Sequence, residues 1–170
     1  MDITKYNKYI RLSNNALSNF KYIEFIKSQT AVRKNINNIP QPEHFQNMEN
    51  LVNNGLQPVR DKYGPIIINS GYRSPELCKE IGSTIYSNHT NGGTADIEPV
   101  YANMKAQILN MLNFIHNNLD YRELIAEFFP NGWIHYSYLQ GGNKRELKLK
   151  DSNHNYNIVS IEYINSIYKS

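Results

Sequence analysis

Three side chains of this sequence have the types and spacing of a zinc site. His89 and Asp96 flank the glycine pair 92–93, and His135 follows further along the chain. Two imidazoles and one carboxylate leave one position of a tetrahedral zinc ion open. Water at an open position becomes a nucleophile at neutral pH, so a hydrolase is expected if the three side chains converge.

The elements around these residues must bring them together. Apolar and polar residues alternate over 94–98 and over 133–138, which predicts two strands. Alternate residues of a strand share a face, so Asp96 and His135 meet if the two strands are neighbours. The two glycines before the first strand allow a sharp turn that returns His89 to the start of that strand.

Histidine and aspartate residues in such settings are more often structural or solvated than metal ligands. A loop histidine is usually solvated, an aspartate near glycines usually belongs to a turn, and His-x6-Asp alone is a weak pattern. The remaining histidines have no comparable setting, and we interpret His44, His116 and His154 as surface or packing residues.

The rest of the chain predicts helices first and then strands mixed with helices. We expect a polar, poorly ordered segment over 1–19, helices over 20–26, 42–63, 75–81 and 102–118, strands over 65–70 and 123–129, and edge elements at 147–149 and 158–161. Gly55 and Pro58 predict a division of the second helix into two pieces. This order indicates a single α+β domain over residues 1–170.

Composition narrows the class of protein. With 170 residues, 40% hydrophobic and 19% charged, the chain can bury a core, and its net charge of +3 is mild. The lone Cys78 excludes an internal disulfide and a cysteine-based zinc site. There is no long run of like charge, no membrane-length apolar stretch and no apolar leader at the start. We therefore expect no nucleic-acid partner, no membrane partner and no secretory signal. A monomer, which could be part of a virion, is a separate expectation.

Three motifs occur in order: Ser-Gly-Tyr-Arg-Ser at 70–74, Ser-Asn-His-Thr-Asn-Gly-Gly-Thr-Ala-Asp at 87–96, and Trp-Ile-His at 133–135. Together they resemble the zinc peptidases of the D-Ala-D-Ala carboxypeptidase family. That family includes vancomycin-resistance dipeptidases and phage L-alanyl-D-glutamate endopeptidases, and it shares its fold with the hedgehog signalling domain. The pattern is similar to that of the small phage and prophage members, and the similarity spans roughly residues 20–165.

The resemblance implies a fold and a metal. The expected architecture is hedgehog/DD-peptidase-like, with a small, mainly antiparallel sheet that carries the zinc site and is flanked by helices. His89, Asp96 and His135 would be the zinc ligands. The expected partner is a peptidoglycan stem peptide.

Other site residues follow from the same resemblance. Arg73 would lie beside the zinc, where it holds a substrate carboxylate or stabilises an oxyanion. Its structural alternative is a salt bridge to an acid such as Glu98. Ser87 would hydrogen-bond near the metal or the substrate. Trp133 would line the cleft or belong to the core.

Hydrolysis also needs a general base. Some relatives have an acid shortly before the last histidine, but Gly132 occupies the position three before His135. Glu127 is the best substitute, because the small phage branch often has an acid at this point. Glu123 and Glu98 are weaker candidates. The structural alternative for Glu127 is a solvated residue at the end of a strand.

The resemblance implies hydrolysis of peptidoglycan stem peptides, of the D-Ala-D-Ala carboxypeptidase or the L-Ala-D-Glu endopeptidase type, by a phage or prophage product. Such a product would be cytoplasmic until released through a holin, or would be carried on a virion. A dipeptidase of free D-Ala-D-Ala is another possibility. The competing hypothesis is a virion or cell-surface domain that keeps the fold without catalysis, favoured by the missing acid near His135.

Overall fold

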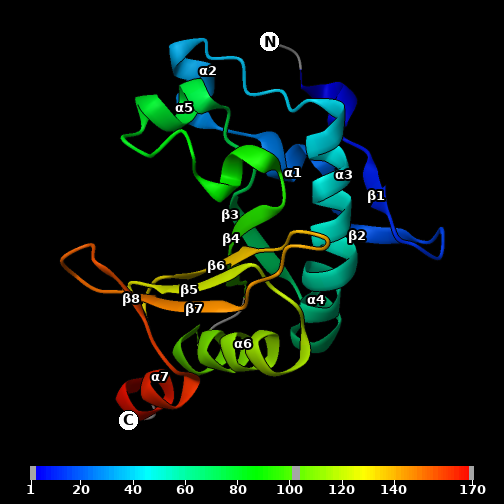
Figure 1. Cartoon of the computed structure of the whole chain (residues 1–170). Coiled ribbons are helices and arrows are strands. Elements are labelled where there is room, and N and C mark those ends of the chain that lie inside the picture. The colour runs from blue at the N-terminus through cyan, green and yellow to red at the C-terminus, as the bar shows by residue number, and fades with distance from the viewer. Residues whose placement is uncertain (1–2, 101–103, 169–170) are drawn as a thin grey trace.

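A six-stranded sheet forms the body of the protein (Figure 1). The computed structural model describes residues 3–100 and 104–168, with only the backbone for 104 and 105. The strand order is β3 (Ile66–Ser70), β4 (Thr94–Pro99), β6 (Trp133–Ser137), β5 (Glu123–Glu127), β7 (Glu146–Lys150), β8 (Tyr156–Ile158). All neighbours are antiparallel except β5 and β7. The predicted α+β class with a small, mainly antiparallel sheet is confirmed.

Helices pack around this sheet (Figure 1). Helix α6 (Met104–Asn118) runs along the sheet and contacts β4 and β6, and α7 (Ile161–Tyr168) packs against α6. The remaining helices are α1 (Tyr22–Ile26), α2 (Gln29–Lys34), α3 (Pro42–Leu51), α4 (Gln57–Tyr63) and α5 (Pro75–Glu80). Within the described ranges, no helix combines the length and the apolar character needed to cross a bilayer.

The two faces of the sheet have different chemistry. One face is apolar and shares a single core with α6, through the buried residues Ala95, Ile97, Leu124, Ala126, Ile134, Tyr136, Leu147 and Leu149 on the strands and Ile108, Met111, Leu112 and Ile115 on the helix. Removing this apolar surface from water stabilises the fold. Because successive strand residues point to opposite faces, the intervening positions project to the other side, where the polar residues lie.

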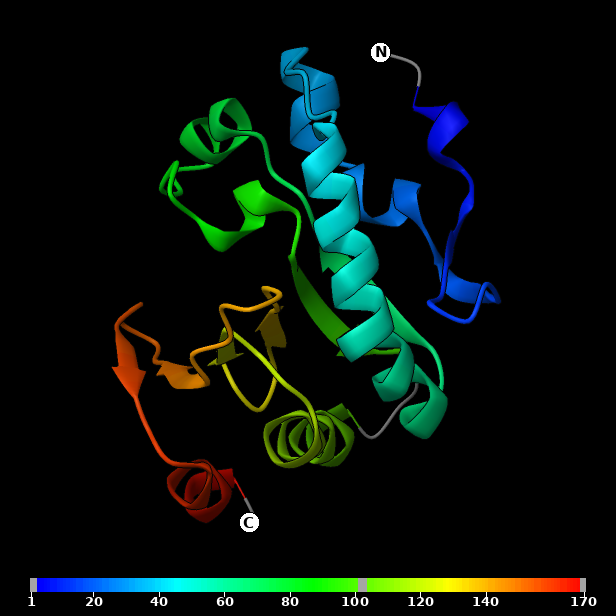
Figure 2. The ribbon, with the colours of Figure 1, turned by 45° about the vertical axis from the view of Figure 1, so that its right-hand side comes forward.

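One long helical segment, called the rod below, runs from Pro42 to Tyr63, as Figure 2 shows. The predicted division at Gly55 and Pro58 takes the form of a π-helical turn (Val52–Leu56), which separates α3 from α4 without interrupting the helical path. A wider turn relieves the clash between a proline ring and the carbonyl four residues earlier. A Cβ at position 55 would lie 2.4 Å from the Tyr136 ring, so glycine allows the rod to approach the sheet closely.

The N-terminal part differs from the irregular segment that we predicted. After a 3-10 turn (Thr4–Tyr6), β1 (Tyr9–Arg11) and β2 (Leu17–Lys21) form an antiparallel hairpin outside the rod (Figures 1 and 2). Only Ile10 of β1 is buried, and Phe20 anchors β2. One inward apolar residue in a three-residue strand is too short a pattern for sequence reasoning to detect.

The C-terminal elements also differ from expectation. Strand β7 is not at the edge but between β5 and β8. The segment predicted as an edge element over 158–161 contains the end of β8 and the start of α7, a helix that we did not predict. The predicted start of α6 at residues 102–103 lies outside the described residues.

Candidate metal centre

The three candidate ligands converge on the polar face of the sheet. Strands β4 and β6 pair so that Asp96 lies opposite His135. His89 comes from a 3-10 turn (Asn88–Asn91) that leads into β4. The Oδ1 atom of Asp96 lies 3.3 Å from His89 Nε2 and 3.0 Å from His135 Nδ1. All three residues are buried, and one ligand atom from each lies within 4.8 Å of the others.

These separations suit a zinc ion. With metal–ligand bonds of 2.0–2.2 Å, tetrahedral ligand atoms lie about 3.3 Å apart. The distances of 3.0 and 3.3 Å around Asp96 Oδ1 are close to that value. Two imidazoles and one carboxylate, with no cysteine, form the donor set of a zinc site that keeps an open position. The cluster therefore fits the metal that the sequence implied.

Local structure orients His89. The Ser87 hydroxyl caps the 3-10 turn by accepting the His89 backbone N–H, at 3.3 Å. Gly92 ends the turn at φ +82°, where a Cβ would lie 2.4 Å from the His44 carbonyl oxygen. His89 Nδ1 lies 2.6 Å from the Gly71 carbonyl oxygen. Donation from Nδ1 to this carbonyl leaves Nε2 free to accept a metal.

Arg73 holds the aspartate of the cluster. Its Nη2 donates to Asp96 Oδ2 at 2.6 Å, and its Nε donates to Ser70 Oγ at 2.8 Å. The Arg73 side chain is 19% exposed and lines the cleft. Glu98, the alternative partner that we considered, forms no ion pair within the described ranges and is not among the lining residues. The guanidinium thus secures one carboxylate oxygen and leaves the other facing the histidines.

The electrostatics of the cluster favour a positive charge between its side chains. Burial acts to lower the pKa of His135, but contacts with Asp96 and Glu123 outweigh it and raise the pKa to about 9. Burial acts to raise the pKa of Asp96, yet the two histidines hold it well below its usual range. Burial lowers the pKa of His89 despite Asp96. The surroundings of His135 thus favour its protonated, positively charged form when no metal is bound.

Strand β5 brings two further carboxylates to the same place. Ile125 pairs with His135, and Glu123 and Glu127 project on either side of it. Glu127 Oε1 lies 4.0 Å from His135 Nδ1, whereas Glu123 Oε2 lies 3.4 Å from His135 Nε2. Glu127 is 6% exposed, so it is not a solvated residue at a strand end.

Each of these carboxylates has a lysine from β7. Lys150 Nζ lies 2.8 Å from Glu127 Oε2, and Lys148 contacts Glu123 Oε1 closely. The parallel register of β5 and β7 sets Lys150 beside Glu127. Our sequence reasoning did not assign these lysines to the site. The signal was the alternation in residues 146–150, which places both lysines on the face opposite the buried leucines.

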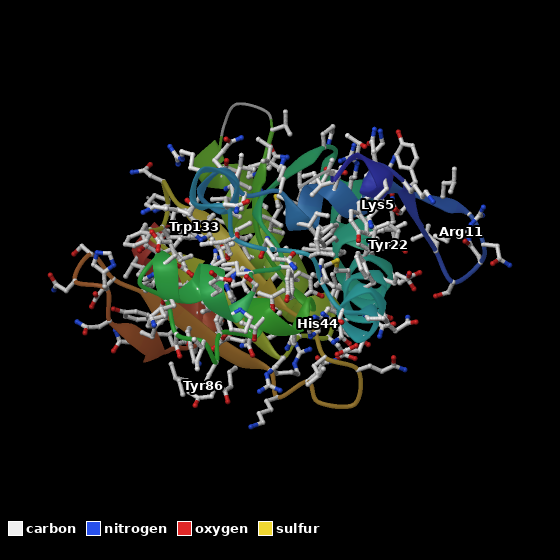
Figure 3. The ribbon with its side chains drawn as sticks, turned by 90° about the horizontal axis from the view of Figure 1, so that it is seen from above. Lys5, Arg11, Tyr22, His44, Tyr86 and Trp133 are labelled. Atoms are coloured by element: carbon white, nitrogen blue, oxygen red, sulfur yellow. The ribbon has the colours of Figure 1, made fainter. Side chains whose placement is uncertain are left out.

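A cleft of about 770 Å³ surrounds the cluster. Trp133 lines it and packs on Phe128, with ring centroids 5.3 Å apart. In Figure 3, Trp133 and the exposed Tyr86 lie on the same side of the molecule, away from Lys5 and Tyr22. His154 lines the cleft and also packs on Phe128, so it is a packing residue that additionally borders the site. The other two remaining histidines, His44 and His116, contact Tyr72 and Tyr121.

A family model described as Peptidase M15 matches residues 18–136. The matched segment contains all three candidate ligands, Arg73 and both β5 carboxylates, and it ends before β7 and its two lysines. The chain matches no curated protein.

Proposed function

The chain belongs to the Peptidase M15 family, and from this premise we propose that it is a zinc-dependent peptidase of peptidoglycan stem peptides. The observation that carries the proposal is the buried cluster of His89, Asp96 and His135 at the bottom of a cleft, with the carboxylate of Glu127 beside it. Cleavage of the D-Ala-D-Ala bond or of the L-Ala-D-Glu bond is compatible with this site.

The donor atoms for the metal are His89 Nε2, Asp96 Oδ1 and His135 Nδ1, because these atoms face one another. Zinc held there supplies Lewis acidity, which lowers the pKa of water and polarises a carbonyl. Asp96 is kept in place by Arg73, and His89 is kept in place by the Gly71 carbonyl. The protein therefore orients two of the three donors before any metal arrives.

Glu127 is proposed as the general base. Its Oε1 lies on the Nδ1 side of His135, the side on which the donor atoms converge. Lys150 holds Oε2 and leaves Oε1 free to take a proton from the attacking water and pass it to the leaving amine nitrogen. This position compensates for Gly132, which occurs where some relatives have an acid.

Arg73, Ser87 and Trp133 are proposed to contact the substrate. All three line the cleft. The fixed cation of Arg73 suits a substrate carboxylate or the oxyanion that forms during hydrolysis. A cleft of about 770 Å³ lies within the usual range of ligand sites, and we propose that it accommodates a segment of a stem peptide.

The competing function is a virion or cell-surface domain without catalysis. The absent acid near His135 favours it, whereas the approach of Glu127 Oε1 to within 4.0 Å of His135 Nδ1 favours catalysis. We propose an enzyme encoded by a phage or prophage that acts on the cell wall as a monomer. It would reach the wall after release through a holin or as part of a virion.

The test is cleavage of defined stem peptides by the purified chain loaded with zinc, read by mass spectrometry. Product masses distinguish loss of a terminal D-Ala from cleavage after L-Ala. The His89→Ala variant is the control and is expected to give no product. Equal product from both proteins would contradict the zinc mechanism. A wild-type protein that binds one zinc and cleaves nothing would favour the non-catalytic domain.

A further inference from the structure

Glu123 approaches the metal cluster from behind His135. Its Oε2 lies 3.4 Å from His135 Nε2, while Asp96 Oδ1 lies 3.0 Å from Nδ1 on the other side of the ring. The ring is 6% exposed, and Nε2 has no hydrogen-bond partner among the described residues. A buried donor without an acceptor costs free energy, and Oε2 is the carboxylate oxygen placed to satisfy it.

The Glu123 carboxylate is itself held in place. Asn88 donates to Oε2 at 2.8 Å, and the Lys148 ammonium contacts Oε1. The Glu123 side chain is 17% exposed. Asn88 directly precedes His89, so this one carboxylate connects the turn that carries the first histidine to the strand that carries the second. A small rotation of the His135 ring or the carboxyl group brings the 3.4 Å contact to hydrogen-bond length.

We propose that Glu123 is a positioning residue of the metal centre. It accepts the Nε2–H of His135, which fixes the tautomer that presents Nδ1 to the ion. Through its hydrogen bond with Asn88, it also fixes the position of the His89 turn relative to His135. The inference rests on the proposed function, because it assumes that the cluster binds zinc. A carboxylate behind a histidine ligand orients the ring and increases its basicity as a ligand.

This role separates the two acids of β5. Glu127 faces Nδ1, where the donor atoms of the cluster meet, and Glu123 faces Nε2, on the far side of the ring. Glu123 is therefore placed to act on the histidine, and Glu127 is placed to act on the reacting water. The weaker candidate base of the sequence thus acquires a different function.

The test is the zinc affinity of the metal-free full chain, measured by competition with a chromophoric chelator. Glu123→Ala is expected to weaken zinc binding about 10- to 100-fold. Glu123→Gln is expected to weaken it less, because the amide oxygen still accepts a hydrogen bond. Glu146→Gln is the matched control, since Glu146 also pairs with Lys148, at 3.0 Å, and forms no ion pair with His135 in the described structure. Its affinity is expected to stay within about twofold of wild type.

A second measurement separates positioning from mere stability. Nitrogen-15 NMR of the zinc-loaded protein is expected to show His135 with a proton on Nε2, and that signal should shift or exchange faster in both Glu123 variants. If Glu123→Ala does not fold, Glu123→Gln decides the question: an unchanged affinity together with an unchanged ring signal overturns the inference. Lost hydrolysis with unchanged zinc affinity also overturns it, because Glu123 would then be the base. A wild-type chain that binds no zinc overturns the proposed function as well.

Discussion

Two groups of side chains line the cleft, and their negative charges are balanced in different ways. The ligand cluster consists of His89, Asp96 and His135, and the carboxylate–lysine array consists of Glu123, Glu127, Lys148 and Lys150. In the cluster one carboxylate faces two imidazoles, and a cation between them is favoured. In the array each carboxylate already has its own ammonium group. The cluster thus has the geometry of a site that suits a metal, and the array places two lysine-paired carboxylates beside it.

Within the array, Lys148 affects the pKa of the carboxylate that it contacts. Burial disfavours the charged form of a carboxyl group, and a nearby ammonium group favours it. Burial acts to raise the pKa of Glu123, but contacts with His135 and Lys148 outweigh it and hold the pKa at about 2. The family match ends before β7, so the residues that would bind the metal lie inside the matched segment and the lysines lie outside it.

The largest effect is expected from breaking the ligand cluster. His135→Ala removes one of three donors, so zinc binding should weaken. Hydrolysis should fall by about 10³-fold or more, because the metal supplies several kcal/mol of stabilisation to the transition state. Metal content and peptide cleavage measure this. His116→Gln, outside the cleft, should leave both unchanged. Full activity of His135→Ala would show that the cluster takes no part in hydrolysis.

A smaller effect is expected from Glu127, the proposed base in the array. Glu127→Gln keeps the shape of the side chain but cannot take a proton, so kcat should fall about 10²- to 10⁴-fold while the zinc affinity remains near that of wild type. Steady-state kinetics and the chelator competition measure the two quantities. If Glu127→Gln retains its activity and Glu123→Gln loses it, the two acids have exchanged roles.

A still smaller effect is expected from the partner of the base. Lys150→Gln leaves the buried Glu127 without its ion pair, which lets the carboxylate move from its position. We expect kcat to fall about 10-fold, with zinc affinity unchanged. Lys144→Gln, at an exposed lysine before β7, is the control. Equal kinetics of the two variants would show that the array does not need this cation.

The smallest effect concerns the metal-free protein and pH. The pKa of His135 is raised to about 9 from an ordinary value of 6.5, so its protonation favours the folded state. This stabilisation is complete below pH 6.5 and is lost as the pH rises through 9. The Tm of the chelator-treated protein should therefore fall by a few degrees over that interval. The zinc-loaded protein should lack this decline, and a flat profile for both would contradict a protonated His135.

Part of the architecture was accessible from local patterns. Apolar residues three and four apart predicted α6 and the rod from Pro42, and alternation predicted β4 and β6. Elements with a short sequence pattern, or with a pattern that depends on distant residues, were not predicted. The β1–β2 hairpin has too few inward residues to show a period. The close approach of Gly55 to the Tyr136 ring joins segments that are far apart in the sequence. The place of β7, next to the edge strand β8, also depends on its parallel pairing with β5.

The sequence by itself determined which residue types are available for zinc, and it placed Asp96 and His135 on matching faces of their strands, because side-chain direction follows the local period. Tertiary structure decided where the two acids lie relative to His135 and which lysines they contact. The pairing of β5 with both β6 and β7 puts Glu127 at one nitrogen of His135 and Glu123 at the other, each with its lysine. The parallel pairing of β5 with β7 depends on packing between segments that are not consecutive in the chain, so no local pattern encodes it.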